Sequence, residues 1–244
     1  LNFHRTDHKD GSATYLREYL RKYLMATRPE RKDYASWNYA QFVTDSILWN
    51  TDPLYGWCNK NFKKDGSPYN VYSDGLKVFT TVDSRMQRYA EEAVYQHVAR
   101  YLQPAFSKEI SSKPSSPYSD KLTPKQIKAI LNRSVTQCER YRQMKEAGCS
   151  AEEIHDTFRK KIPMTVFTYH GDIDTLMSPL DSIRYYKTFL RSGFMSMDPK
   201  TGAVKAYVGG LDYTHFMYDM VSLGRRQVGS TIKPFLYSLA MSNG

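Results

Sequence analysis

Apolar side chains recur at helical spacing between Ala13 and Ala26. Tyrosines and leucines fall on one face of this segment, and its arginines and lysine lie outside that face. Spacings of three and four residues are typical of an amphipathic helix. A basic amphipathic helix can lie on a membrane surface. Packing of the Tyr and Leu side chains within the protein is the simpler interpretation, so we predict an ordinary surface helix.

The pattern changes several times over the next hundred residues. Residues 27–50 are rich in aromatic side chains and are predicted to be helical. Leu76–Val82 combines β-branched and aromatic residues, which predicts a strand. Asp83 or Ser84 is then predicted to cap a helix that runs to about Leu102. Residues 103–121 are rich in Ser, Pro and Lys and are predicted to form a linker or exposed loop.

Two later segments begin with helix-capping sequences. Thr123 precedes Pro124, which suits an N-cap followed by the first helical position, and the helix should run to about Ala147. Ser150 and Glu153 have the spacing of a capping box, which predicts a second, shorter helix. We interpret these two helices as a helical insertion.

The clearest β pattern lies in residues 194–208. Two apolar runs flank a turn that begins at Asp198 and ends at Gly202, where glycine can take the left-handed conformation. This pattern predicts an antiparallel hairpin. A strand is also predicted at Met164–Thr168, and a helix from Pro179.

A Ser-x-x-Lys sequence, Ser230 to Lys233, stands at the start of the last predicted helix. Pro234 is tolerated only in the first turn of a helix, so this helix must begin near Ser230. Residues three apart share a helix face, which brings the lysine within reach of the serine hydroxyl. A serine needs an adjacent base to act as a nucleophile, and a lysine serves when burial or nearby charge lowers its pKa. Taken alone, the four residues fit a serine N-cap and a solvated lysine better.

Composition narrows the class of protein. The 244 residues are 41% hydrophobic, which excludes a disordered chain. The net charge of +10 favours anionic partners, but the sequence lacks the motifs of nucleic-acid-binding domains, so no nucleic acid is expected. Its three cysteines form no CxxC motif and its histidines show no metal-ligand spacing. We therefore expect no metal and no cofactor.

From Gly193 onward the chain resembles the start of the transpeptidase domain of bifunctional (class A) penicillin-binding proteins. The segments that carry this resemblance are Met197-Asp198-Pro199-Lys200-Thr201-Gly202, Val204-Lys205-Ala206-Tyr207-Val208-Gly209-Gly210, Arg225-Arg226-Gln227 and Gly229-Ser230-Thr231-Ile232-Lys233-Pro234-Phe235. Upstream, residues 74–83 are similar to the interdomain linker of that family. The resemblance is dense over 193–241 and patchy over 1–190.

The resemblance implies roles for two residues. Ser230 would be the acylated serine, and Lys233 its base and proton shuttle. Ser230 would attack the D-Ala-D-Ala carbonyl of a peptidoglycan stem peptide, and an amine of a neighbouring stem would then take the acyl group. A β-lactam would acylate the same serine.

The family also requires Ser-x-Asn and Lys-Thr-Gly motifs after the nucleophile. Neither follows Ser230 here, so the chain by itself is expected to be inactive. Lys200-Thr201-Gly202 spells the second motif but precedes the serine and lies in the predicted turn. Ser36-Trp37-Asn38 spells the first but lies far upstream. Neither is assigned to the site.

The implied fold is α+β: helical N-terminal and linker regions precede the opening strands and nucleophile helix of an incomplete penicillin-binding transpeptidase domain. We expect a helical region after a glycosyltransferase domain, a linker strand-helix region, a helical insertion and the start of the transpeptidase domain. Their predicted ranges are 1–70, 71–121, 122–162 and 163–244.

The resemblance also implies a location and partners. The parent protein would lie at the periplasmic or extracellular face of the cytoplasmic membrane, anchored by a segment absent from this chain. It would also be a peptidoglycan glycosyltransferase. Its partners would be peptidoglycan stem peptides, the lipid-linked precursor, β-lactam antibiotics and other cell-wall synthesis proteins.

Alternatives stay open at this point. The chain could belong to a serine β-lactamase or a β-lactam sensor. Region 1–190 could instead be a non-catalytic pedestal that binds partner proteins or glycan. Arg225 and Arg226 either draw anionic substrate toward Ser230 or are simply solvated.

Overall fold

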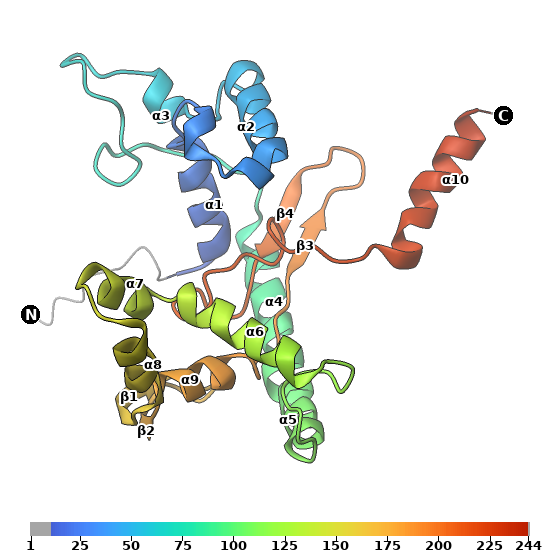
Figure 1. Cartoon of the computed structure of the whole chain (residues 1–244). Coiled ribbons are helices and arrows are strands. Elements are labelled where there is room, and N and C mark those ends of the chain that lie inside the picture. The colour runs from blue at the N-terminus through green and yellow to red at the C-terminus, as the bar shows by residue number, and fades with distance from the viewer. Residues whose placement is uncertain (1–10, 244) are drawn as a thin grey trace, which may run out of the picture. The chain divides into compact units, whose positions relative to one another are not determined.

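The computed structural model describes residues 11–243. The chain divides into two compact units, which we call the hairpin unit (Leu1–Ala90 with Gly193–Gly244) and the middle unit (Glu91–Ser192). Helices and two small antiparallel sheets form the described part of the chain (Figure 1). This composition confirms the expected α+β fold.

The hairpin unit contains three N-terminal helices, α1 (Thr14–Leu24), α2 (Tyr39–Thr51) and α3 (Trp57–Lys60). Helix α1 confirms the predicted amphipathic helix and packs against β4 (Val204–Val208) and α3. Tyr15 is buried at its start, and its hydroxyl donates to the carbonyls of Asp212 (3.0 Å) and Phe216 (2.7 Å). The ends of the apolar face of α1, Tyr15 and Leu24, are therefore buried in this unit, whereas Tyr19 is exposed. The expected helix over 27–50 is helical mainly from Tyr39.

The predicted hairpin is confirmed. Strand β3 (Phe194–Met197) pairs antiparallel with β4, and a register shift lies at Ser196/Met197. In the turn, the Asp198 carboxylate accepts the backbone N–H groups of Lys200 (2.8 Å) and Thr201 (3.0 Å). Gly202 ends the turn with φ +72°. Aspartate and glycine thus fix the turn for the reasons that predicted it.

The strand predicted at Leu76–Val82 is wrong. This segment is extended but forms no strand, and Phe79 is 92% exposed. Its hydrogen bonds to β4 lie at one end, where Thr81 Oγ1 donates to the Val204 carbonyl (2.8 Å) and Asp83 N donates to that of Lys205 (3.0 Å). A β-rich composition makes a strand only when a partner supplies a continuous ladder.

Part of the loop predicted at 103–121 is also wrong. Helix α4 (Ser84–Tyr95) continues through a π-helical stretch, Gln96–Leu102, into α5 (Gln103–Ser111). Gln103 is buried, and its amide bonds to the Thr188 carbonyl (3.0 Å) and the Leu190 N–H (2.9 Å). These long-range bonds fix a helix where composition indicates a loop. Pro104 directly follows the π-helical stretch, where the α-helical hydrogen-bond pattern is already interrupted.

The middle unit continues with three helices, α6 (Pro124–Thr136), α7 (Glu139–Glu146) and α8 (Ala151–Arg159). Both predicted helix starts are confirmed as capping boxes, at Thr123 with Gln126 and at Ser150 with Glu153. The single helix expected from Thr123 to Ala147 is wrong, because it breaks between α6 and α7. Just before the break, the Thr136 hydroxyl donates to the Arg133 carbonyl, a local bond that competes with helix continuation.

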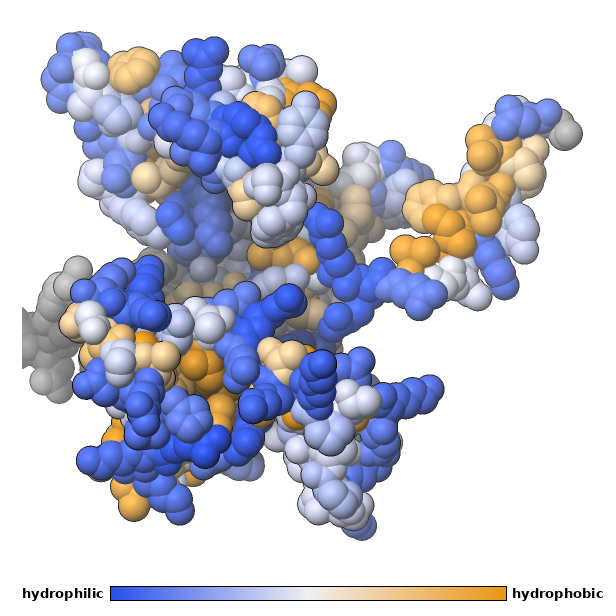
Figure 2. All heavy atoms as spheres, in the orientation of Figure 1, coloured by the Kyte–Doolittle hydropathy of each residue, from blue (hydrophilic) through white to orange (hydrophobic). Residues whose placement is uncertain are grey.

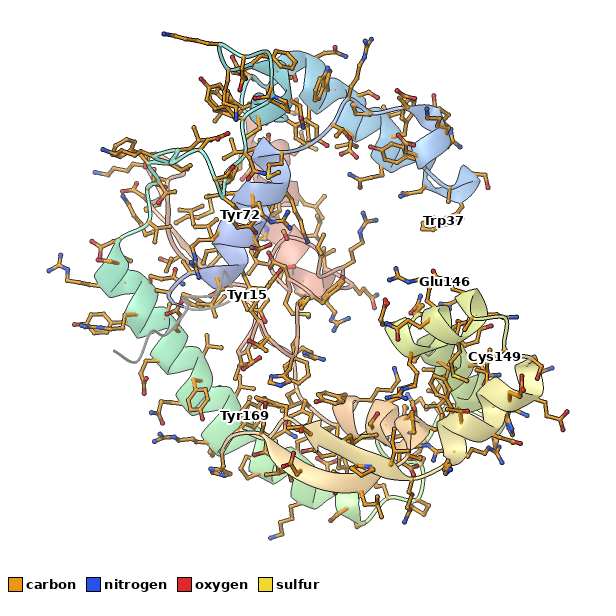
Figure 3. All side chains as sticks on the ribbon, turned by 90° about the vertical axis from the view of Figure 1, so that its left-hand side faces the viewer. Tyr15, Trp37, Tyr72, Glu146, Cys149 and Tyr169 are labelled. Carbon is orange, nitrogen blue, oxygen red and sulfur yellow. The ribbon has the colours of Figure 1, made fainter. Side chains whose placement is uncertain are left out.

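The middle unit also holds strands β1 (Ile162–Val166) and β2 (Ile173–Met177) and helix α9 (Pro179–Tyr186). The two strands pair antiparallel, so the predicted strand near Met164 is confirmed, and β2 was not predicted. Helix α9 contacts α6 and α8. The middle unit also contains a cluster of aromatic rings whose neighbouring centroids lie 5.1–5.6 Å apart. One member of the cluster, Tyr169, is labelled in Figure 3. The members of this cluster are Phe167, Tyr169, Tyr185 and Phe189.

Candidate active site

Ser230 lies where the last helix begins. A 3-10 turn, Gly229–Ile232, leads directly into α10 (Lys233–Ser242), and the Lys233 N–H donates to the Ser230 carbonyl. Pro234 occupies the first turn of α10. The helix start that was predicted near Ser230 is therefore confirmed, with one 3-10 turn at its beginning.

The two predicted catalytic side chains are both exposed. Ser230 and Lys233 lie on consecutive turns of the chain, and no hydrogen bond joins their side chains in the described residues. Residues 11–243 do not enclose this pair. Their assignment as nucleophile and base stays a prediction.

Helix α10 presents apolar side chains to solvent. Figure 2 shows hydrophobic residues gathered over it. Phe235 is 72% and Met241 78% exposed. An apolar surface of this kind is typical of a helix that packs inside a domain or interface. The exposed apolar residues of α10 are Phe235, Leu236, Tyr237, Leu239 and Met241.

The loop between β4 and α10 is fixed by Asp219, which is only 7% exposed. Its carboxylate accepts the hydroxyls of Tyr207 (2.6 Å) and Ser222 (2.8 Å) and the backbone N–H of Val221 (2.9 Å). Burial is the main cause that raises the pKa of Tyr207, and the hydrogen bond to Asp219 raises this pKa further. The loop is therefore tied to β4 through a charged acceptor that sequence reasoning did not single out.

Two glycines let α1 approach this loop closely. A Cβ at Gly209 would lie 2.5 Å from Asp219 Oδ1 and 2.7 Å from the Tyr15 ring, and one at Gly210 would lie 2.3 Å from the Tyr15 hydroxyl. The sequence indicated these glycines only as the end of a strand. Their additional role is to leave room for Tyr15.

Gln87 is a second buried polar residue that sequence patterns missed. Its amide N–H donates to the Tyr207 carbonyl (2.9 Å), and the Tyr207 N–H donates to its carbonyl oxygen (2.7 Å). This pairing satisfies the outer backbone edge of β4 and fixes α4 to it. Helical spacing marks Gln87 as a neighbour of apolar positions but gives no sign that its partner is a strand.

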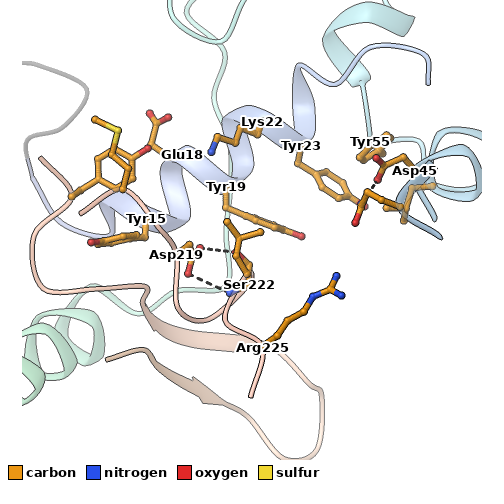
Figure 4. A pocket seen from close by; sticks show the side chains of 15 residues that line it. Tyr15, Glu18, Tyr19, Lys22, Tyr23, Asp45, Tyr55, Asp219, Ser222 and Arg225 are labelled. Carbon is orange, nitrogen blue, oxygen red and sulfur yellow. Dashed lines mark hydrogen bonds between the residues drawn. The ribbon is translucent and has the colours of Figure 1, made fainter. Parts of the chain in front are cut away.

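A cavity of about 510 Å³ lies between α1, α2 and the loop that Asp219 holds (Figure 4). We call it the tyrosine pocket. Burial, followed by the charges of Asp219 and Asp52, raises the pKa of Tyr19 in its wall. The lining includes Tyr15, Glu18, Tyr19, Lys22, Tyr23, Gln41, Asp45, Tyr55, Tyr213, Asp219, Ser222 and Arg225. Arg225, one of the two arginines before the Ser-x-x-Lys sequence, thus lines a pocket, and Arg226 does not.

Neither a metal centre nor a membrane span is evident within residues 11–243. No group of three or more His, Cys, Asp or Glu side chains in this range is arranged to hold a metal ion. No helix in the same range has the length and hydrophobicity needed to cross a membrane.

Comparison with known proteins adds independent evidence. Residues 113–190 match the penicillin-binding protein middle domain. Penicillin-binding protein 1A of Neisseria flavescens is 29% identical over 210 residues, which cover 75% of this chain and 25% of that protein. Its counterpart in Neisseria meningitidis serogroup A is 28% identical over 204 residues, covering 72% and 24%. Penicillin-binding protein 1A of Vibrio cholerae is 45% identical over 53 residues, covering 22% and 6%.

These matches bear on the resemblance found in the sequence. No solved structure is significantly similar to the chain. The chain spans about a quarter of the length of the Neisseria relatives. The middle-domain match includes the predicted helical insertion, while the four domain boundaries stay a prediction. The middle-domain match and the likeness to penicillin-binding proteins 1A over about three quarters of the chain support the resemblance to class A penicillin-binding proteins.

Proposed function

We propose that this chain is part of a D,D-transpeptidase of peptidoglycan synthesis in which Ser230 is the nucleophile and Lys233 the base. One observation carries the proposal: the Ser-x-x-Lys sequence lies at the start of a helix that comes after an antiparallel hairpin. Residues 113–190, which precede the hairpin, match the middle domain of penicillin-binding proteins. This match supports the assignment of residues 193–244 to a transpeptidase domain.

The helix start suits acyl transfer. Ser230 Oγ forms a bond to the D-Ala-D-Ala carbonyl carbon as its proton passes to Lys233. The backbone N–H groups of the first turn favour the negative charge that develops on the carbonyl oxygen. The carbonyl carbon then releases D-Ala, whose amine takes the proton. The amine of a neighbouring stem peptide next attacks the acyl-serine ester and restores the Ser230 hydroxyl.

Exposed apolar side chains on α10 support the same proposal. A nucleophile helix inside a transpeptidase domain needs cover on most of its faces, and the α10 surface has the required composition. In the complete protein this cover would enclose Lys233 and lower its solvation, as a lysine base requires. We further propose a glycosyltransferase activity for the whole protein and a membrane-anchored position outside the cytoplasm.

The proposal is tested by acylation of the full-length protein with a fluorescent penicillin. We expect stable labelling that Ser230→Ala abolishes. Ser238→Ala is the matched control, because Ser238 lies on the same helix and its hydroxyl donates to the Pro234 carbonyl of that helix. Labelling of this control should equal that of the unmodified protein.

Other results would favour the alternatives. Rapid turnover of the penicillin, with no stable label, would indicate a β-lactamase. A stable label without transfer to an amine acceptor would indicate a sensor. Absence of any acylation in the folded full-length protein would refute the assignment of Ser230 and leave the pedestal interpretation.

A further inference from the structure

We propose that the tyrosine pocket binds a saccharide that carries a carboxylate group. The pocket belongs entirely to the hairpin unit, and it is separate from the Ser230–Lys233 pair. Three of its properties lead to this ligand: two unpaired cations, a set of aromatic ring faces, and hydrogen-bond acceptors suited to sugar hydroxyls.

The pocket wall carries three carboxylates, each with hydrogen-bond partners, and two cationic side chains without such partners among residues 11–243. The Glu18 carboxylate forms an ion pair with Arg21 (2.9 Å) and accepts a hydrogen bond from the Tyr72 hydroxyl (3.1 Å). Asp219 accepts several hydrogen bonds from its own loop and from β4. In contrast, the side chains of Lys22 and Arg225 make no hydrogen bond or ion pair with another residue in 11–243.

The two cations suit a carboxylate. Lys22 projects from α1 and Arg225 from the loop, so they reach the same cavity from different elements. Figure 4 shows the Arg225 side chain extending toward the rings of Tyr19 and Tyr23. A guanidinium binds a carboxylate through two parallel hydrogen bonds, and an ammonium adds a point charge.

Aromatic rings form the apolar part of the wall. Tyr19 and Tyr23 are stacked with centroids 5.8 Å apart, and Tyr55 meets Tyr23 edge to face at 5.0 Å. Such ring faces pack against the C–H faces of sugar rings. On α2, the Gln41 amide N–H donates to Asp45 Oδ1 (2.8 Å), which leaves the Gln41 carbonyl oxygen as an acceptor for a sugar hydroxyl.

The wall is held in place before any ligand binds. The Tyr23 hydroxyl donates to Asp52 Oδ2 (2.5 Å), and the Tyr34 hydroxyl donates to Asp45 Oδ2 (2.8 Å). The loop is fixed through Asp219 and through Tyr15, whose hydroxyl bonds two of its carbonyls. Preorganised walls lower the entropic cost of binding. The tyrosine pocket is therefore formed before the ligand binds.

The ligand class is narrowed further by the proposed function, on which this step alone rests. A peptidoglycan strand is a saccharide whose stem peptides carry carboxylates, and Arg225 lies in the segment that leads to Ser230. The pocket would hold a glycan strand by its sugar and a stem carboxylate. The Ser230 pair would act on another part of the same polymer.

Binding is tested on this chain with two probes, a disaccharide tetrapeptide from peptidoglycan and neutral chitotetraose. We expect the carboxylate-bearing probe to bind roughly tenfold more tightly in calorimetric titration. Lys22→Gln and Arg225→Gln should each weaken its binding by roughly fivefold to tenfold. Arg226→Gln is the matched control, because it removes the same charge from the adjacent residue, which does not line the pocket. Circular dichroism confirms that each variant is folded.

Three results would overturn the proposal. They are no binding of the disaccharide tetrapeptide by the folded chain, equal affinity for the neutral probe, and an equal loss of affinity in Arg226→Gln. Ser230→Ala should leave binding of the disaccharide tetrapeptide unchanged. Failure of penicillin labelling with intact saccharide binding would refute the proposed function alone, and the reverse result would refute the pocket alone.

Discussion

Asp219 shows how one residue fixes the loop ahead of the candidate nucleophile. All of its partners are donors: the Tyr207 and Ser222 hydroxyls and the N–H groups of Val221 and Ser222. A buried carboxylate can accept all four bonds, whereas an amide has one acceptor oxygen and would leave the protons of the hydroxyls without their acceptor. The carboxylate of Asp219 therefore suits this set of donors better than an amide would.

Asp219→Asn is expected to destabilise the hairpin unit by about 2 kcal/mol, because a charge-assisted network loses an acceptor in a buried site. Chemical denaturation followed by tyrosine fluorescence measures the change. Asp65→Asn is the control, since both bonds from Ser67 go to Asp65 Oδ1, which an amide oxygen can replace. An equal loss in both variants would contradict the role of Asp219.

At the scale of elements, local capping signals are reliable in this chain. Helix α9 begins with Ser178, whose hydroxyl accepts the Asp181 N–H (3.1 Å) and donates to its carboxylate (2.7 Å). This bond from Ser178, with help from Arg184, lowers the pKa of Asp181. Because the folded-state pKa is lowered, its contribution to stability is present above the unfolded-state value of 3.8 and is lost as pH falls through the folded-state value.

The helix start should therefore weaken in acid. We expect the Asp181 carboxyl to titrate below its ordinary range in an NMR pH titration of the chain. Ser178→Ala should move this titration upward, toward the ordinary value. It should also reduce the loss of thermal stability between about pH 5 and about pH 2. An unchanged Asp181 titration in the Ser178 variant would contradict the capping interpretation.

Elements that need distant partners behave differently. The sequence of Leu76–Val82 favours a strand, but the segment finds only end contacts with β4 and stays outside both sheets. Residues 103–111 favour a loop, but Gln103 binds backbone groups near residue 190 and the segment is helical. In both places tertiary partners, or their absence, override local preference.

At the scale of the whole molecule, the two units are each built around their own core. The hairpin unit buries Tyr15, Tyr207 and Val208. The middle unit buries Ile154, Phe158 and Phe167, and the Phe167 ring contacts the Phe189 ring. The hairpin unit is formed from two separated stretches of sequence, with the middle unit inserted between them.

Separate cores predict separate unfolding. Differential scanning calorimetry of the chain should show two transitions, and Asp219→Asn should lower only the one that belongs to the hairpin unit. Phe158→Ala, which creates a cavity in the core of the middle unit, should lower only the transition of that unit, by several degrees. A single transition that both variants lower together would contradict independent cores.

Short-range features of this protein are determined by the sequence by itself. The turn at Asp198–Gly202, the capping boxes at Thr123 and Ser150, and the helix start at Ser230 depend on neighbouring residues and on allowed backbone angles. The order of these pieces along the chain also indicates the family. Such features need no distant partner, so local residue choice is enough to specify them.

Tertiary structure decided the rest. The tyrosine pocket joins residues of α1 and α2 to Arg225, about 200 positions away, and no periodicity in the sequence connects them. The roles of Gln87, Asp219 and the glycine pair likewise exist only once α1, α4 and β4 are packed together. Burial and pairing between residues far apart in the sequence depend on which surfaces pack together, and the conformational preferences of short segments do not specify this packing.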